Sequence, residues 1–164
     1  MKALIIGYGS PIRGDDAIGP LAADRLDRLL EQGALPDWIE VQSRHILTAE
    51  LVEDLRRSDL AIFLDAAADT PPGEVRCRPL QADATALSTM AHFHDPRELL
   101  AWCEALYGKA PSAWLISAGG AEWDYSNCQL SHTASAAMER MIDQVMERLG
   151  LAAPMPAVSL GNLR

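Results

Sequence analysis

Short runs of apolar residues alternate along the chain with longer segments in which apolar residues recur at every third or fourth position. Continuous apolar runs are typical of strands that are buried on both faces of a parallel sheet. Strands are therefore expected at residues 3–6, 38–41, 60–64 and 113–117. The spacing of three and four predicts helices with one buried stripe, at residues 17–32, 96–107 and 131–149, with a shorter helix at residues 48–55.

This alternation predicts an α/β fold: a three-layer sandwich with a mostly parallel five-stranded sheet and helices on both faces. Residues 74–80 supply the fifth strand, and their polar–apolar alternation is typical of an edge strand with one solvated face. We expect one domain over residues 1–151 and a loose C-terminal tail over residues 152–164.

The helix over residues 96–107 has clear signals at both ends. Asp95 suits the N-cap, Pro96 the first helical position and Glu98 the third, and the helix stops at Gly108. The expected inward-facing residues are Leu99, Leu100, Cys103, Leu106 and Tyr107.

Charge and composition narrow the class of protein. The chain has 164 residues, with 23 Asp and Glu against 14 Lys and Arg, so the formal net charge is −9. This argues against binding to nucleic acid or to a membrane surface, because phosphates attract Lys and Arg. No run of about 18 apolar residues predicts a membrane span, and the three cysteines lack CxxC spacing. We expect a cytoplasmic monomer without a disulfide framework or a zinc cluster.

Folds of this class place their sites beyond the carboxyl ends of the strands, and the loop after the first strand is the most informative. Gly7 and Gly9 allow a tight turn, and Gly14 can supply a positive φ before Asp15 and Asp16. A dinucleotide-binding loop is excluded, because it needs a further glycine at position 12 and the two carboxylates would repel a pyrophosphate. A phosphate-binding Walker loop is excluded as well, since Gly-Lys-Ser/Thr is missing.

Acidic residues end two of the predicted elements at the same edge of the sheet. Asp15 suits an N-cap, whereas Asp16 and Asp65, which follow the first and third strands, together predict a cation site. One of His92 and His94 can add an imidazole from the loop before the helix over residues 96–107, and the residues themselves do not decide which. His45 follows the second strand, so it is expected either at the surface, which is preferred, or near the site, and His132 is expected at the surface or as a helix cap. A phosphorylatable receiver domain also carries such acids, but the Lys it needs after the fifth strand is missing here, at residues 116–120.

Three segments resemble signatures of the hydrogenase maturation proteases. Residues 5–19, Ile-Ile-Gly-Tyr-Gly-Ser-Pro-Ile-Arg-Gly-Asp-Asp-Ala-Ile-Gly, resemble the opening motif of that family. Residues 63–67 resemble its second signature, an apolar strand that ends in Asp-Ala. His-Phe-His-Asp-Pro at residues 92–96, followed by Leu99-Leu100 and Leu106-Tyr107-Gly108, resembles the third. The resemblance spans nearly the whole chain.

The resemblance implies an α/β sandwich that acts as an endopeptidase of aspartic type. Family members remove a C-terminal peptide from the nickel-loaded large subunit precursor of a NiFe hydrogenase, and the nickel belongs to that substrate. Carried over to this sequence, the metal-binding residues are Asp16, Asp65 and His92, and the catalytic residues are Asp16 and Asp65. His92 is preferred to His94 because its spacing to Leu99 matches the family. No organic cofactor is implied.

Two further expectations concern chemistry and specificity. The backbone N–H groups of Gly119 and Gly120 are candidate donors to an oxyanion. The loop 43–48 departs from the pattern common in the family and resembles that of a different branch, which bears on substrate choice. The alternative function is a non-proteolytic, nickel-sensing assembly chaperone of the same partner.

Overall fold

A five-stranded sheet forms the centre of the computed structural model, which describes residues 1–85, 95–125 and 129–152. The strands lie in the order β2-β1-β3-β5-β4, and only the edge strand β4 is antiparallel to its neighbour. Their bounds are β1 Ala3–Tyr8, β2 Ile39–Arg44, β3 Leu60–Ala67, β4 Val75–Leu80 and β5 Ser112–Gly119. The predicted α/β architecture and the predicted edge strand are both confirmed.

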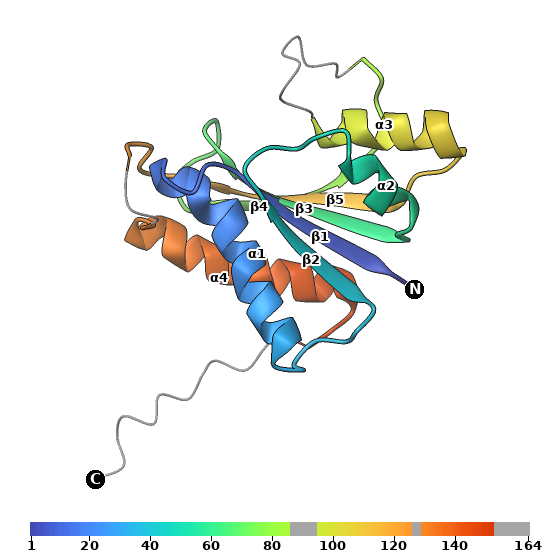
Figure 1. Cartoon of the computed structure of the whole chain (residues 1–164). Coiled ribbons are helices and arrows are strands. Elements are labelled where there is room, and N and C mark those ends of the chain that lie inside the picture. Colours follow the sequence, from blue (N-terminus) through green and yellow to red (C-terminus); the bar gives the residue numbers. More distant parts are fainter. Residues whose placement is uncertain (86–94, 126–128, 153–164) are drawn as a thin grey trace.

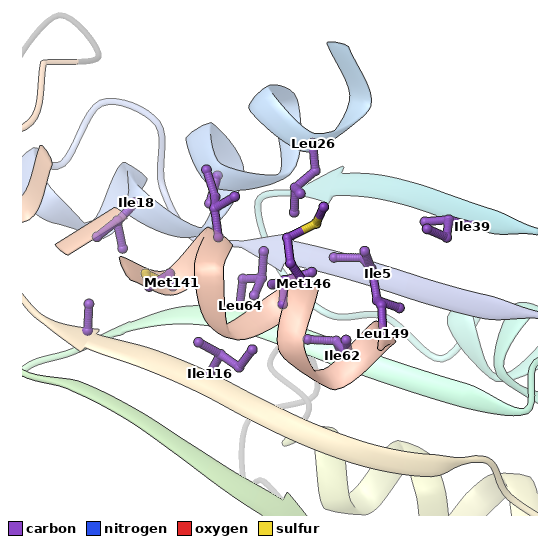
Figure 2. Close-up of a cluster of buried hydrophobic side chains, with 14 of the residues drawn as sticks. Ile5, Ile18, Leu26, Ile39, Ile62, Leu64, Ile116, Met141, Met146 and Leu149 are labelled. Carbon is purple, nitrogen blue, oxygen red and sulfur yellow. The ribbon is translucent and has the colours of Figure 1, made fainter. Parts of the chain in front are cut away.

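Helices cover both faces of this sheet (Figure 1). Their bounds are α1 Ile18–Glu31, α2 Leu51–Arg56, α3 Pro96–Tyr107 and α4 His132–Leu149, with a short 3₁₀ helix, η1 Gly14–Ala17, before α1. Helices α1 and α4 pack on one face, where side chains such as Leu26, Met141 and Met146 meet Ile5 and Ile62 (Figure 2). Helices α2 and α3 pack on the other face. The three-layer sandwich is therefore confirmed.

Residues of the central strands β1, β3 and β5 alternate between these two cores, as the pleat of a strand requires. On β3, Ile62 and Leu64 lie in the core below α1 and α4, whereas Ala61 and Phe63 lie in the core below α2 and α3. Asp65 comes two positions after Phe63 and so points to the same face as Ala61 and Phe63. The parity of the strand therefore places this carboxylate on the α2/α3 face.

Helix α3 begins as predicted but buries less of its surface than predicted. The Asp95 side chain accepts a hydrogen bond from the Arg97 N–H at 2.8 Å, and Gly108 ends the helix with a φ of 76°. The expectation that Leu106 and Tyr107 face inward is wrong, because they are 63% and 43% exposed. Only the first two turns of α3 reach the core, and the last turn lies at the surface.

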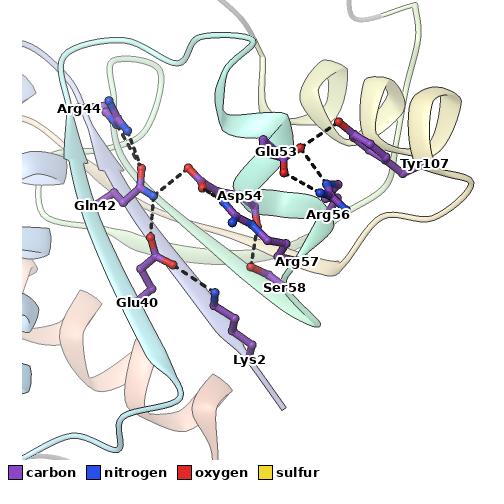
Figure 3. A network of polar contacts seen from close by, with 10 residues as sticks. All are labelled: Lys2, Glu40, Gln42, Arg44, Glu53, Asp54, Arg56, Arg57, Ser58 and Tyr107. Atoms are coloured by element: carbon purple, nitrogen blue, oxygen red, sulfur yellow. Dashed lines mark hydrogen bonds and ion pairs between the residues drawn. The ribbon is translucent and has the colours of Figure 1, made fainter.

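Polar contacts at the surface explain the position of Tyr107 (Figure 3). Its hydroxyl donates to Glu53 on α2 at 3.0 Å, and the Arg56 guanidinium lies over its ring at 4.9 Å from the centroid. A tyrosine at the edge of a helix pair can bury part of its ring and keep its hydroxyl in a polar environment. The same network ties α2 to β2, since the Gln42 side-chain amide donates to Asp54 at 3.1 Å.

The start of α1 lies directly against the carboxyl ends of β1 and β3. A Cβ atom on Gly19 would collide with the carbonyl oxygens of Tyr8 and Leu64, so a residue without a side chain is required there. β1 is also the point where the strand order reverses, because β2 and β3 flank it on opposite sides. Such switch points are where open α/β sheets bind their ligands.

Candidate functional site

Tyr8 and Asp65 lie side by side at the switch point. Gly7 is in register with Leu64, so the next residues of the two parallel strands are Tyr8 and Asp65, on the α2/α3 face. The Tyr8 hydroxyl donates a hydrogen bond to the Asp65 carboxylate, and the Ala66 N–H donates to Asp65 Oδ1 at 2.8 Å. Two donors from neighbouring strands therefore hold this carboxylate.

Asp16 reaches the same place from η1. Its Oδ2 accepts a hydrogen bond from the Ser10 N–H at 2.8 Å, which closes the loop between β1 and η1. Asp16, Asp65, Tyr8 and His45 line one cavity of about 170 Å³, referred to below as the acid pocket. Two carboxylates and an imidazole-bearing residue thus share one small space.

Burial is the main influence on Asp65. Burial, reinforced by the nearby Asp16 charge, raises the pKa of Asp65 from 3.8 to about 7, although the hydrogen bonds from Tyr8 and Ala66 act in the opposite direction. Burial and the Asp65 charge also raise the pKa of Tyr8 well above its usual value. Tyr8 therefore stays protonated and acts as a donor, whereas Asp65 exchanges protons near neutral pH.

Tyr8→Phe is expected to raise the pKa of Asp65 further, because the substitution removes a donor that favours the ionised carboxylate. Carbon-13 NMR of the Asp65 carboxyl as a function of pH measures this directly. Tyr107→Phe is the matched control, since it removes another hydroxyl that donates to a carboxylate, that of Glu53 at the surface. A pKa of Asp65 that is unchanged in Tyr8→Phe would contradict the hydrogen bond.

Asp15 has a structural position that differs from the expected helix cap. Its buried carboxylate accepts from the backbone N–H groups of Ala121, Glu122 and Ser131 at 2.7, 3.0 and 2.9 Å, and from the Ser131 hydroxyl at 2.7 Å. Burial raises its pKa, but these hydrogen bonds outweigh burial and leave the pKa below its usual value. Gly14 has the predicted positive φ, of 55°. Asp15 therefore joins the first loop to the segment after β5 and to the start of α4.

The histidines are placed only in part. His45 is exposed, as expected, yet it also lines the acid pocket, and His132 is exposed at the first position of α4. The predicted ligand His92 and its alternative His94 lie outside the described residues. Within residues 1–85, 95–125 and 129–152, no three His, Cys, Asp or Glu side chains are arranged to hold a metal ion. The metal-binding and catalytic roles of Asp16, Asp65 and His92 therefore stay predictions.

The proposed oxyanion donors are wrong, because both N–H groups already have partners. The Gly119 N–H donates to the Glu74 carbonyl oxygen at 2.9 Å, and the Gly120 N–H donates to the Ala67 carbonyl oxygen at 3.4 Å. Strand β5 extends to Gly119, so its backbone is used in pairing with the adjacent segments.

A second cavity, of about 360 Å³, adjoins the acid pocket and shares Tyr8 and Asp65 with it. It lies on the α2/α3 face over Leu115 of β5, and Arg78 of β4 and Arg97 of α3 line it as well. We refer to it as the arginine pocket. Asp65 thus lines both cavities, and arginine side chains line only the second.

Sequence reasoning missed Tyr8 as part of the site. Its signal was available, because Tyr8 stands between Gly7 and Gly9 at the end of a buried strand and continues the even-numbered series of Leu4 and Ile6. A polar aromatic residue at that parity faces the same core as Asp65.

Comparisons with known proteins concern the fold of the whole chain. No protein-family model and no curated protein matches the sequence. Among solved structures, a hydrogenase 2 maturation peptidase from a Thaumarchaeota archaeon is 26% identical, with a TM-score of 0.68 over 93% of this chain and 100% of that chain. The hydrogenase maturating endopeptidase HybD from E. coli is 21% identical, with a TM-score of 0.71 over 92% of this chain and 93% of that chain.

A third structure, the [NiFe] hydrogenase maturation protease HycI from Thermococcus kodakarensis KOD1, is 24% identical, with a TM-score of 0.69 over 91% of this chain and 92% of that chain. In the part of the chain that the structure describes, no helix has the length and apolarity needed to cross a bilayer. The five-stranded fold, the position of the opening motif at the switch point and the similarity over the whole length of the archaeal peptidase show that this chain has the fold of the hydrogenase maturation proteases and is similar to them.

Proposed function

We propose that this chain is an endopeptidase that removes a C-terminal peptide from the nickel-loaded large subunit precursor of a NiFe hydrogenase, and so activates it. The observation that carries the proposal is that Asp16 and Asp65 line one small cavity at the switch point, in a chain with the fold of hydrogenase maturation proteases. In this proposal the enzyme is of aspartic type and works as a cytoplasmic monomer without an organic cofactor.

Recognition of the substrate's nickel is the first role of the acid pocket. Carboxylate and imidazole groups bind divalent nickel well, and the ion arrives already seated in the partner. One oxygen of each carboxylate is held by a backbone N–H, that of Ser10 for Asp16 and that of Ala66 for Asp65. This restricts how the carboxylates rotate and lowers the entropic cost of binding an ion. The resemblance adds His92 as the third ligand.

Cleavage requires a water molecule to lose a proton as it attacks the peptide carbonyl. Asp65, a carboxylate of the acid pocket, accepts that proton in this proposal and returns it to the leaving amine. Tyr8 donates to the same carboxylate and holds its orientation. In this proposal the nickel contact positions the scissile bond beside Asp65.

The test is to mix the purified protein with nickel-loaded precursor and to follow the mass of the large subunit. The expected result is the loss of a single C-terminal peptide, with nickel-free precursor as the control that stays intact. Nickel-loaded precursor that is bound but never shortened would instead support the assembly chaperone. Absence of both binding and cleavage would contradict the proposed function.

A further inference from the structure

We propose that the arginine pocket binds the C-terminal extension of the substrate and that Arg78 pairs with a carboxylate of this extension. This inference rests on the proposed function and adds to it the direction in which the substrate lies. The extension would leave the acid pocket at Asp65 and run beneath the start of α3 toward the edge strand β4.

The position of the arginine pocket is the first argument. It shares Tyr8 and Asp65 with the acid pocket, so a chain whose scissile bond lies at Asp65 enters both cavities. Leu115 provides an apolar floor, and Arg78 is directly opposite it in register on β4. Because β4 is the edge strand, a segment of any length can continue past Arg78 into solvent without meeting another strand.

The charge of Arg78 is the second argument. The other arginine of the pocket, Arg97, is already paired with Asp95, through Nε at 3.1 Å and through Nη2 at 3.0 Å. The Arg78 side chain has neither a hydrogen bond nor an ion pair with any residue that the structure describes. Its five N–H donors are therefore available to a ligand, and the planar guanidinium matches a carboxylate in particular.

The two pockets together determine the direction in which the substrate binds. The acid pocket is suited to a cation because of Asp16 and Asp65. In the arginine pocket, Asp95 is paired with Arg97, so Arg78 is the charged group that can receive an anion at the end of the pocket away from Asp65. A precursor that carries nickel on one side of the scissile bond and a carboxylate on the other fits in only one direction. The carboxylate can be an acidic side chain or the C-terminus of the extension, and the experiment below separates these sources.

The experiment measures binding and cleavage separately. A fluorescein-labelled synthetic peptide that spans the cut and the extension of the precursor is titrated with wild type, Arg78→Gln and Arg76→Gln, and its anisotropy is recorded. Arg76 is the matched control, because it lies two residues away on the same strand, pairs with Glu74 at 3.1 Å and does not line the pocket. Loss of a charged hydrogen bond predicts a Kd about tenfold higher for Arg78→Gln only.

Variants of the peptide identify the carboxylate. One peptide has its Asp and Glu replaced by Asn and Gln, and another has an amidated C-terminus. The peptide that lacks the relevant carboxylate should bind wild type about tenfold more weakly, and Arg78→Gln should not distinguish it from the parent. In processing of the nickel-loaded precursor, Arg78→Gln should raise KM and leave kcat unchanged.

The inference is overturned if Arg78→Gln binds the peptide as wild type does, or if Arg76→Gln weakens binding equally. It is also overturned if neither carboxylate matters. These outcomes concern binding alone, so they are independent of cleavage. If wild type binds the peptide through Arg78 and yet leaves the precursor intact, the proposed endopeptidase activity fails while the subsite stands.

Discussion

Replacing Asp65 by asparagine is expected to stop processing of the precursor and, at pH 8, to make the folded chain more stable. Activity should be lost because asparagine cannot accept the proton of an attacking water and is a poor nickel ligand. Stability should rise because the native chain holds an ionised carboxylate in a place where burial disfavours the charge.

The direction in which stability changes with pH follows from the raised pKa of Asp65. Below about pH 4 Asp65 is protonated in both the folded and the unfolded chain, and the folded state bears no penalty. As the pH rises, the unfolded chain releases its proton first, so stability falls until about pH 7, where the folded carboxyl also ionises. A change in pKa from 3.8 to about 7 corresponds to ~4 kcal/mol at most. We expect Asp65→Asn to raise the free energy of unfolding at pH 8 by roughly 1–3 kcal/mol. The gain is smaller than the full penalty because asparagine accepts less well from the Ala66 N–H and the Tyr8 hydroxyl.

Urea unfolding of wild type and Asp65→Asn at pH 4 and at pH 8 measures this difference, with processing of the nickel-loaded precursor followed in parallel. Asp69→Asn is the control, because Asp69 is exposed and four residues further along the same segment. A stability gain that is equal at both pH values would contradict the burial of an ionisable Asp65. Normal processing by Asp65→Asn would remove this residue from the catalytic site.

Asp15→Ala is expected to destabilise the chain by about 3–5 kcal/mol. The carboxylate has no exposed surface and satisfies three backbone N–H groups and one hydroxyl. Alanine would leave these part-buried donors without their acceptor, which costs more than the loss of the hydrogen bonds alone. Asp15 belongs to the opening motif together with Asp16, yet the two acids have different roles.

The pH dependence of Asp15 has the opposite sign to that of Asp65. Its pKa is lowered in the folded state, so its contribution is present above the unfolded value of 3.8 and is lost as the pH falls through the folded pKa. Urea unfolding of wild type, Asp15→Asn and Asp15→Ala at pH 7, with Asp24→Ala as the exposed control on α1, tests the contact. If Asp15→Ala does not fold, Asp15→Asn should still unfold at lower urea than wild type. A variant as stable as wild type would show that these hydrogen bonds contribute nothing.

The sheet and its helices could be predicted because their signals are local. Apolar runs, the polar–apolar alternation of β4 and the cap at Asp95 each depend on a few neighbouring residues. The meeting of Asp16 and Asp65 at one edge followed from a topological rule about parallel strands. Each of these inferences needs only the order of the elements and no side-chain contact.

What could not be predicted depends on contacts between distant segments. Asp15 accepts from residues more than 100 positions away, so its burial is invisible in its own neighbourhood. The N–H groups of Gly119 and Gly120 were available in principle, but pairing with Glu74 and Ala67 uses them. Leu106 has the spacing of a core residue and is exposed because the core ends before the last turn of α3.

Side chains along β3 alternate between the two faces of the sheet, so the face on which Asp65 lies depends on the exact number of residues in the strand. Asp65 lies on the α2/α3 face only because it comes two positions after Phe63 and four positions after Ala61. Loops around the sheet can lengthen or shorten without moving this carboxylate. A single residue inserted or deleted between Phe63 and Asp65 would turn it into the core of Leu26 and Met141, where a carboxylate cannot be accommodated. Divergence along β3 is therefore restricted to replacement of one residue by another, without insertion or deletion.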